Sequence, residues 1–292
     1  EISNDFVTNL KNERIFSSEF SYLYRNAWLS ANVSGYYSRL ENVTEWQNFY
    51  NDDENSFTYV SMTGLKKEYY GVEVGAKFKL TSWLDLKTLG AMSEAKNINN
   101  VNAVYMLSKS AEVYQDKAYV MNMRESGTPL TVGSIGLDAH VNGWFVNLNA
   151  NYYDRIYLSY SPSYRYEKTL KNRHKAHRAF SEIFPEVMTE DETSWREDAV
   201  AQEKGHGGWM VDLSIGKSVR LKKGSLNFNL MITNLLNNQT IVTGGYEQNS
   251  RSSYTLDSNG EVKNPRYYQF SKNPKKYYTW GTNGMFQVSY RF

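Results

Sequence analysis

The stretch Met285–Phe292 (MFQVSYRF) closes the sequence, and apolar and polar side chains alternate along it. Its apolar set is Phe286, Val288, Tyr290 and Phe292. A period of two places this set on one face of a β-strand. Chain termini usually fray in water, whereas an aromatic ring that ends a lipid-facing strand lies at the headgroup level. The stretch therefore predicts the C-terminal strand of a bacterial outer-membrane β-barrel, the strand that barrel-assembly machinery would engage.

The composition combines many aromatic residues with a low mean hydropathy. There are 24 Tyr, 13 Phe and 7 Trp among 292 residues, yet the mean hydropathy is -0.63. No apolar run approaches the roughly 20 residues that a transmembrane helix requires. A membrane barrel explains both facts, because it encloses a polar lumen behind an apolar belt. The absence of Cys fits an oxidising periplasm, and a net charge of +2 without a long basic run does not indicate a nucleic-acid partner.

Eight further segments repeat the alternation of the last strand. The clearest are Tyr69–Leu80, Trp144–Tyr153, Trp209–Gly216 and Leu226–Thr233, and weaker ones are Arg14–Arg25, Trp28–Leu40, Leu84–Ala95 and Pro129–Val141. Most approach the roughly 9–11 residues with which a tilted strand crosses a bilayer. The sequence therefore predicts an all-β, transmembrane antiparallel barrel to which this chain contributes about nine strands.

The connections between these segments alternate between short and long. Short turns are predicted at 25–27, 81–83, 142–143 and 222–224, and the long connections are Tyr50–Phe57, Lys96–Thr128, Tyr157–Gly207 and Leu236–Lys276. Outer-membrane barrels have short periplasmic turns and long extracellular loops. The first predicted strand leads into a short turn, so it starts on the extracellular side, and the last strand ends on the periplasmic side.

An odd set of strands that starts outside the cell is not a complete bacterial single-chain barrel, because such barrels have an even number of strands. The first strand would also present an open edge to lipid, where unsatisfied backbone groups cost several kcal/mol each. We therefore expect further strands upstream in the same polypeptide or on another chain. Residues 1–292 are interpreted as the C-terminal part of a larger barrel.

No motif in the sequence indicates catalysis. A hydrolase would need a nucleophile, a histidine and an orienting partner within hydrogen-bond reach, and neither a G-x-S-x-G element nor a P-loop occurs. His174 and His177 are three residues apart but lack a third ligand at a zinc-site spacing. His140 is predicted to lie in the lumen beside Asp138. We expect no enzyme activity, no catalytic residue, no cofactor and no metal site.

Two tyrosine-rich stretches allow two interpretations. They are Tyr157–Tyr166 (YLSYSPSYRY) and Tyr267–Tyr278. Their rings either belong to the extracellular aromatic girdle and the barrel wall above the membrane, or they form a stacking surface for a ligand such as a sugar or a peptide. The sequence does not assign individual substrate-binding residues.

The segment Asn229–Asn249 (NLMITNLLNNQTIVTGGYEQN) resembles the end of SusC-like TonB-dependent transporters. The elements that carry the resemblance are Asn234-Leu235-Leu236-Asn237-Asn238, Gly245-Tyr246-Glu247-Gln248, Lys276-Tyr277-Tyr278 and the terminal Phe292. Similar elements upstream are Tyr69-Tyr70-Gly71-Val72-Glu73, Ser126-Gly127-Thr128-Pro129 and Trp144–Tyr153. The resemblance covers most of the chain, and it rests on the order and spacing of these elements.

The resemblance implies a 22-stranded barrel with an N-terminal plug, located in the outer membrane of a Gram-negative bacterium. It implies active import of a nutrient, a glycan or a peptide, driven by the TonB complex through an N-terminal TonB box. It also implies a surface lipoprotein partner of the SusD type, besides the surrounding outer-membrane lipid. Neither a plug nor a TonB box is recognisable in residues 1–292, so this chain would supply barrel wall and extracellular loops.

One alternative remains open from the sequence, a smaller complete outer-membrane barrel. It would be an autotransporter translocator, or a porin or anchor that holds a surface protein. A translocator would need about twelve strands and a lumen helix near the N-terminus, and residues 1–13 show no convincing helix. The Tyr157–Gly207 loop is also long for such a barrel.

Overall fold

The computed structural model describes residues 10–51, 55–110, 112–170, 201–247, 253–260, 262–266 and 274–292. Within these ranges the chain is almost entirely antiparallel β-structure. No helix among the described residues is long and apolar enough to cross a membrane. The predicted His174 and His177 pair lies outside the described residues.

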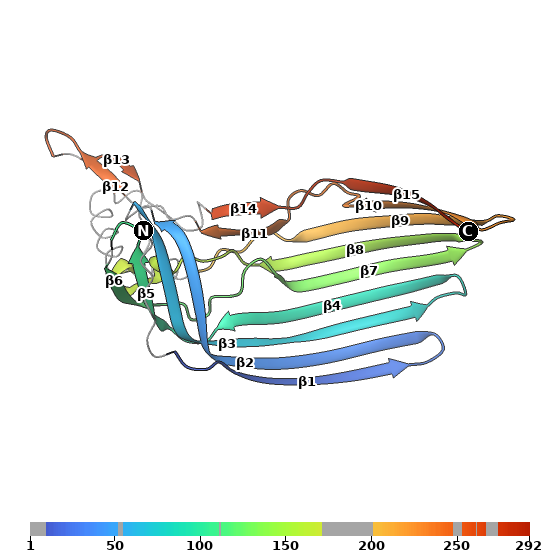
Figure 1. Cartoon of the computed structure of the whole chain (residues 1–292), viewed down its shortest axis with the longest axis horizontal. Coiled ribbons are helices and arrows are strands. Elements are labelled where there is room, and N and C mark those ends of the chain that lie inside the picture. The colour runs from blue at the N-terminus through green and yellow to red at the C-terminus, as the bar shows by residue number, and fades with distance from the viewer. Residues whose placement is uncertain are drawn as a thin grey trace.

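A single large sheet dominates the molecule (Figure 1). Its main path follows the order β1-β2-β3-β4-β7-β8-β9-β10-β15. These nine strands are β1 (Arg14–Arg25), β2 (Leu29–Asn51), β3 (Ser56–Lys79), β4 (Leu84–Asn97), β7 (Pro129–Val141), β8 (Trp144–Ile156), β9 (Gly208–Arg220), β10 (Ser225–Thr233) and β15 (Asn283–Arg291). They are the nine strands predicted from the alternation, and the predicted bounds of β1 and β7 are the observed ones.

The two ends of the sheet differ, as the connections predict. The four short turns and the C-terminus lie at one end, here called the turn end, and the long connections lie at the other, the loop end (Figure 1). The β7–β8 turn is Asn142–Gly143, with φ of 49° and 75°. Two successive positive φ angles form a type I′ turn, whose twist matches that of the flanking strands.

The register sorts the side chains of the sheet onto an apolar face and a polar face. On the apolar face, Leu86, Leu137, Leu148 and Leu213 form one cross-strand row. On the polar face, the adjacent row is Asp85, Asp138, Asn147 and Ser214. Directly opposed residues of antiparallel strands point to the same face, so the alternation read along each strand becomes a property of the whole sheet.

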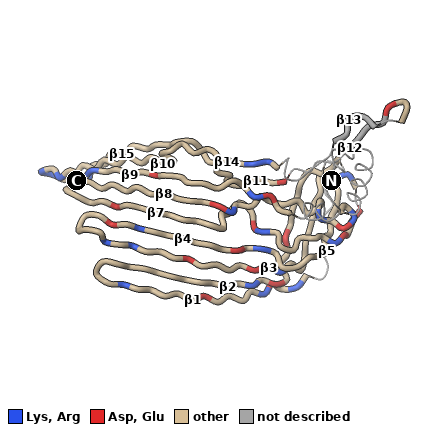
Figure 2. The backbone as a smooth tube through the Cα atoms, turned by 180° about the vertical axis from the view of Figure 1, so that it is seen from behind, with Lys and Arg blue, Asp and Glu red and all other residues tan. Residues whose placement is uncertain are grey.

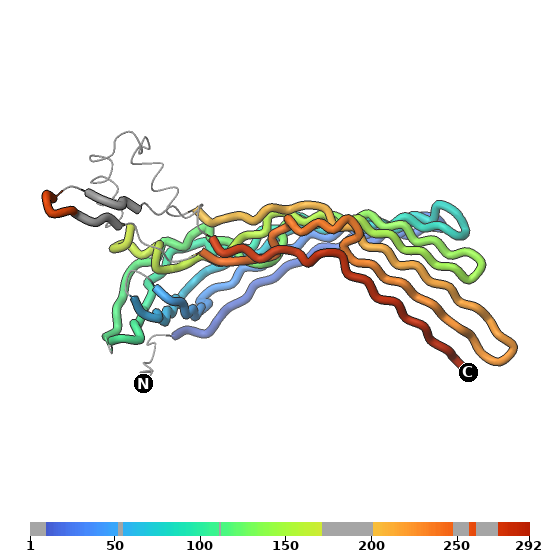
Figure 3. Tube along the Cα trace, turned by 90° about the horizontal axis from the view of Figure 1, so that it is seen from above, coloured from blue at the N-terminus to red at the C-terminus, as the bar shows by residue number. Residues whose placement is uncertain are grey.

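The apolar face is exposed in the described chain. The exposed fraction is 74% for Phe20, 53% for Val72 and 64% for Phe286. The sheet is twisted and curved when seen from above (Figure 3), as expected from the right-handed twist of strands. Charged residues gather toward the loop end (Figure 2), whereas β10 carries none.

The long connections contain strands of their own, which the sequence did not predict. They hold β5 (Val101–Leu107), β6 (Val113–Ala118), the short 3-10 helix η1 (Pro162–Arg165), β11 (Val242–Glu247), β12 (Ser253–Leu256), β13 (Val262–Arg266) and β14 (Pro274–Tyr278). β5 pairs with β3 and β6, β11 with β14, and β12 with β13. The expected loop Tyr50–Phe57 is wrong in extent, because β2 continues to Asn51 and β3 begins at Ser56. The connection between them is therefore a hairpin tip.

Two β-bulges mark where β2 and β3 leave the regular part of the sheet. Asn42 and Gly64 have φ of 58° and 80°, and the register between the strands shifts at Leu40/Val43 and Val43/Thr44. Each bulge inserts one extra residue into its strand. Beyond the bulges, the side that continues the polar face carries an apolar core. This core consists of Val60, Met62, Leu65, Val101, Ala103, Ala118, Val120, Met123, Tyr160 and Tyr166.

The segment 157–166, here called the strap, covers this core. Tyr160, Tyr164 and Tyr166 are 8%, 2% and 4% exposed. Neither interpretation of the stretch, a girdle or a stacking surface, fits these three buried rings, whereas Tyr157 is half-buried. Their polar hydroxyls and large apolar area suit a packed segment as well as a surface, so composition alone could not distinguish the two.

The main sheet is an open arc. Among the described residues, β1 pairs only with β2, and β15 pairs only with β10. A strand edge without a partner exposes a row of backbone donors and acceptors.

Candidate functional site

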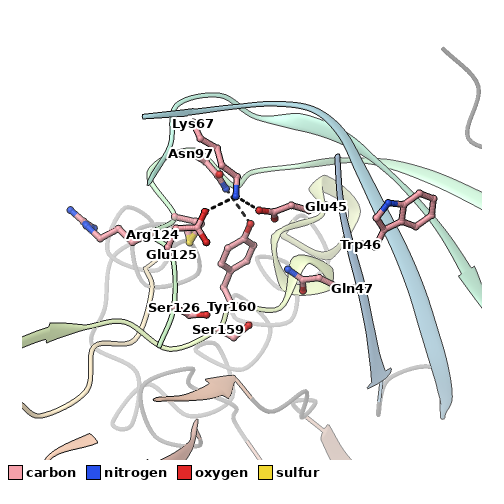
Figure 4. Close-up of a pocket in the computed structure, with 11 residues that line it drawn as sticks. Glu45, Trp46, Gln47, Lys67, Asn97, Arg124, Glu125, Ser126, Ser159 and Tyr160 are labelled. Carbon is pink, nitrogen blue, oxygen red and sulfur yellow. Dashed lines mark hydrogen bonds and ion pairs between the residues drawn. The ribbon is translucent and has the colours of Figure 1, made fainter. Parts of the chain in front are cut away.

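A cavity of about 180 Å³ lies at the loop end, where the polar face meets the core under the strap. Its wall includes Glu45 from β2, Lys67 from β3, Asn97 from the end of β4, Glu125 and Tyr160. Lys67 and Asn97 are opposed in the β3–β4 register, so both side chains lie on the same side of the sheet. Figure 4 shows these side chains around the cavity.

Lys67 is held between two carboxylates. Its Nζ donates to Oε1 of Glu125 at 2.6 Å and to Oε1 of Glu45. The hydroxyl of Tyr69 also donates to Oε1 of Glu125, at 2.9 Å. The Lys67 side chain is 7% exposed, whereas those of Glu45 and Glu125 are 24% and 40% exposed. The cation is therefore the interior member of the cluster, and the two anions reach solvent.

Lys67 stays protonated in this environment. Burial lowers the pKa of its ammonium group, but the hydrogen bonds and charges of Glu125 and Glu45 outweigh burial and raise the pKa above its ordinary value. Because the two carboxylates share one ammonium group, the cluster carries a net charge of one negative unit when both are ionised.

Asn97 and Tyr160 close the cavity on another side. The Asn97 Nδ2 donates to the hydroxyl of Tyr160 at 3.1 Å, and Asn97 is 3% exposed. Burial, and next the charge of Glu45, raise the pKa of the Tyr160 hydroxyl, so this group stays neutral. Tyr160 belongs to the strap, and the shape of the cavity therefore depends on how the strap is held.

A buried ion pair fixes the strap. The Arg165 guanidinium binds both carboxylate oxygens of Glu247 from β11, at 2.6 and 2.7 Å, and both side chains are 0% exposed. The Ser161 amide donates to Glu247 Oε2 at 2.9 Å, and the Arg165 guanidinium lies 5.3 Å from the centre of the Tyr160 ring. A bidentate pair with further hydrogen bonds is the geometry in which burial of two charges is tolerated.

Gln202 ties the strap to the segment that carries Glu125. Its Oε1 accepts from the Arg124 amide at 2.6 Å, and its Nε2 donates to the carbonyls of Arg124 and Leu158 at 2.7 and 2.9 Å. The Arg124 side chain turns away from the cavity in Figure 4. Its Nε donates to Glu94 at 3.0 Å, and its guanidinium lies over the ring of Tyr157.

The predicted C-terminal strand is observed as β15. Phe286, Val288 and Tyr290 oppose Leu230, Phe228 and Leu226 of β10, so they lie on the apolar face. Phe292 follows the strand, and its ring contacts Tyr290 edge-on with centroids 4.9 Å apart. β15 runs to the C-terminus at the turn end (Figure 1), and none of its residues lines the cavity.

Of the other residues considered from the sequence, His140 and Asp138 lie among the described residues. His140 and Asp138 are two residues apart in β7, so their side chains lie on the same face of the sheet. The His140 amide donates to the Trp83 carbonyl at 2.8 Å. The described residues contain no group of three or more His, Cys, Asp or Glu placed to hold a metal ion. A second hollow of about 410 Å³ lies on the polar face, beside Lys77, Lys87 and Asn149.

Apart from Tyr160, which lies in a tyrosine-rich stretch considered as a ligand surface, these residues of the cavity were not singled out from the sequence. Glu45, Lys67, Asn97, Glu125 and Tyr160 come from five separate segments. One pattern could have indicated that β2 continues past residue 43. Glu45, Gln47 and Phe49 alternate there and share a face of the strand. The bulges at Asn42 and Gly64 each add one residue, so the alternation changes face there and the strands predicted from it are too short.

Comparison with known proteins establishes the fold. No protein-family model and no curated protein sequence matches this chain. Among solved structures, the copper transporter OprC superposes with a TM-score of 0.56 at 13% identity, covering 97% of this chain and 32% of OprC. The ferric-catecholate import receptor Fiu from K12 E. coli, in its closed form, gives a TM-score of 0.45 at 14% identity, covering 95% of this chain and 28% of Fiu. The chain thus has an all-β, antiparallel barrel fold and spans about a third of the length of OprC.

Proposed function

We propose that this chain forms the C-terminal part of the barrel wall of a SusC-like, TonB-dependent transporter in the outer membrane of a Gram-negative bacterium. The observation that carries the proposal is the main sheet, whose nine-strand path has one apolar and one polar face. The chain superposes on OprC over 97% of its length. OprC is a copper transporter. At 13% identity that likeness concerns the fold, so transport and location belong to the proposal.

The apolar face gives the physical reason for a membrane. Side chains such as Val72, Ile135 and Val288 are 53%, 51% and 50% exposed in the described chain. A face of this extent is unfavourable in water, and outer-membrane lipid is its natural partner. The span would occupy the roughly 9–11 residues of each strand next to the turn end. Lys67, the strap and the cavity lie beyond it, on the extracellular side.

The open edges of β1 and β15 call for further strands. Within lipid, each unsatisfied backbone group costs several kcal/mol, so the arc is stable there only as part of a closed barrel. We infer that the remaining strands, a plug and a TonB box lie outside residues 1–292, and that the TonB complex acts through that region. The polar face then lines the lumen around the plug.

The cargo of the proposed transporter is a nutrient, a glycan or a peptide, captured at the loop end. A SusD-type surface lipoprotein would cover this end. Phe286, Val288, Tyr290 and Phe292 would present the strand through which barrel-assembly machinery inserts the protein. A complete small barrel would instead have β1 hydrogen-bonded to β15, and these two strands do not pair among the described residues.

The test is to isolate the protein from outer membranes and to measure its intact mass and its crosslinking to TonB. This chain of 33.8 kDa covers 32% of OprC, and 33.8 kDa divided by 0.32 gives about 100 kDa for a protein of OprC-like length. We expect a mass of that order, and a crosslink to TonB that disappears when the N-terminal region is deleted. A complete protein of 33.8 kDa in the membrane, without a TonB crosslink, would refute the proposal.

A further inference from the structure

The cavity at the loop end has a defined charge pattern. Glu45 and Glu125 both use Oε1 to bind Lys67, and the described residues place no hydrogen bond on Oε2 of either carboxylate. Both glutamates are partly exposed, while Lys67 is almost fully buried. A ligand that enters the cavity therefore meets two carboxylate oxygens before it meets the ammonium group.

The charge balance of the cavity favours a positively charged ligand group. One ammonium group between two carboxylates leaves one negative charge. Arg124 does not compensate it, because its guanidinium points away from the cavity and binds Glu94 (Figure 4). An ammonium group placed on the two Oε2 atoms would give an alternating arrangement of two anions and two cations, and such charge-assisted hydrogen bonds are the strong ones.

The cavity is poorly suited to a neutral sugar ring. Sugar sites commonly offer an exposed aromatic face for stacking. Here the indole of Trp46 points away from the cavity (Figure 4), and the Tyr160 ring is 8% exposed beneath the Arg165 guanidinium. The volume of about 180 Å³ accommodates one residue-sized group and not an extended chain.

We propose that this cavity binds the primary ammonium group of the transported ligand, between Oε2 of Glu45 and Oε2 of Glu125, with Lys67 as the fixed cation that bridges the two carboxylates through their Oε1 atoms. This rests on the proposed transport function and narrows its substrate class to amine-bearing ligands. An unblocked peptide amino terminus and an amino sugar both provide the group. The peptide is favoured, because the cavity lacks a ring platform among its described residues.

The experiment measures direct binding to the full-length protein in detergent by calorimetry. The probes are trialanine, N-acetyl-trialanine, a glucosamine trimer and maltotriose. We expect trialanine to bind, and N-acetylation to weaken binding by at least about tenfold, because it removes the charge. Preference for the glucosamine trimer would keep the ammonium site but assign it to amino sugars. Equal binding of trialanine and its acetylated form, or tighter binding of maltotriose, would overturn the inference.

Variants locate the effect in the cavity. Glu45→Gln and Glu125→Gln keep the side-chain shape and remove one charge, and each is expected to weaken trialanine binding at least about tenfold while leaving N-acetyl-trialanine unchanged. Glu112→Gln, at the β5–β6 hairpin outside the cavity, is the matched control and should leave both affinities unchanged. An equal effect of all three variants would contradict a local site. The acetylation comparison on the unmodified protein remains decisive if a variant fails to fold.

Failure of this inference and failure of the proposed function give different results. A TonB-crosslinked, outer-membrane protein that does not distinguish trialanine from its acetylated form leaves transport intact and removes the ammonium site. Acetylation-sensitive binding by a protein that neither reaches the outer membrane nor crosslinks to TonB leaves the site intact and removes the transporter.

Discussion

Replacing Asn234 with alanine is expected to loosen the junction between β10 and β15. Asn234 directly follows β10 and is 2% exposed. Its Nδ2 donates to the carbonyls of Asn238 and Trp280 at 3.0 and 2.7 Å, and its Oδ1 accepts from the Asn238 amide at 2.9 Å. Its φ is 53°, in the left-handed region that asparagine tolerates better than most residues. One side chain thus hydrogen-bonds both the loop after β10 and the segment that leads into β15.

The magnitude follows from these contacts. Alanine removes the three side-chain hydrogen bonds, each worth about 1 kcal/mol net. Alanine is also less stable than asparagine in the left-handed backbone conformation, which costs about 1 kcal/mol more. The local opening free energy should therefore fall by about 4 kcal/mol, or roughly a thousandfold in the opening equilibrium. Asn234→Gly loses the same bonds without the backbone strain, so its loss should be about 3 kcal/mol, or roughly a hundredfold.

Hydrogen–deuterium exchange measures this opening directly. The reporters are the amides of Asn237 and Asn238, which bond to Asn234, and that of Thr282, which bonds to Asn237. Amides between β7 and β8 are the internal control and should not change. Acceleration of less than about tenfold in the alanine variant, or faster exchange in the glycine variant than in the alanine variant, would refute the reasoning.

Three further predictions concern the strap, its tyrosine and the end of the chain. Arg165→Ala should lower the free energy of unfolding by about 3–5 kcal/mol, because Glu247 stays buried without its partner. Denaturant titration measures this loss. The double variant Arg165→Met with Glu247→Leu should lose less, because it leaves no buried charge unpaired. Burial raises the pKa of Tyr160, so the stability that its proton contributes is complete below about pH 10 and is lost as the pH rises through the folded-state pKa. The unmodified protein should therefore lose more stability between pH 9 and 11 than Tyr160→Phe, measured by the same titration. Deletion of Phe292 should lower the amount of folded protein in the outer membrane several-fold, measured by fractionation, whereas Lys222→Ala in the β9–β10 turn should not.

The regular part of the sheet could be predicted from the sequence. The bounds of β1 and β7 agree with the predicted Arg14–Arg25 and Pro129–Val141, because each strand has an apolar and a polar side. A shift of one residue would exchange the two sides, so the pattern fixes which face each residue occupies. The β7–β8 turn could also be predicted, because Asn142 and Gly143 readily adopt the positive φ angles that a two-residue hairpin turn needs.

The loop end could not be predicted to the same degree. Its strands are short, and the contacts that hold them are made between distant segments, such as Arg165 with Glu247 and Gln202 with Arg124. The tyrosines of the strap gave no signal of burial. The cavity could not be predicted for the same reason. Each of its polar residues resembles an ordinary strand or loop residue in its local sequence. The charge pattern of the cavity forms only where these distant segments meet.

The bulges at Asn42 and Gly64 explain why the cavity lies where it does. The same side of β3 carries Glu73 and Lys77 below the bulges and Val60 and Met62 above them. Below the bulges, that side is polar, and no described residue packs against it. Above them, it is apolar and packs against the strap. Lys67 lies at this boundary, buried on the core side and facing two solvent-reaching carboxylates on the other. A charged group is tolerated at such a boundary only when it is paired, and the pairing leaves the outward carboxylate oxygens available to a ligand that arrives from the loop end.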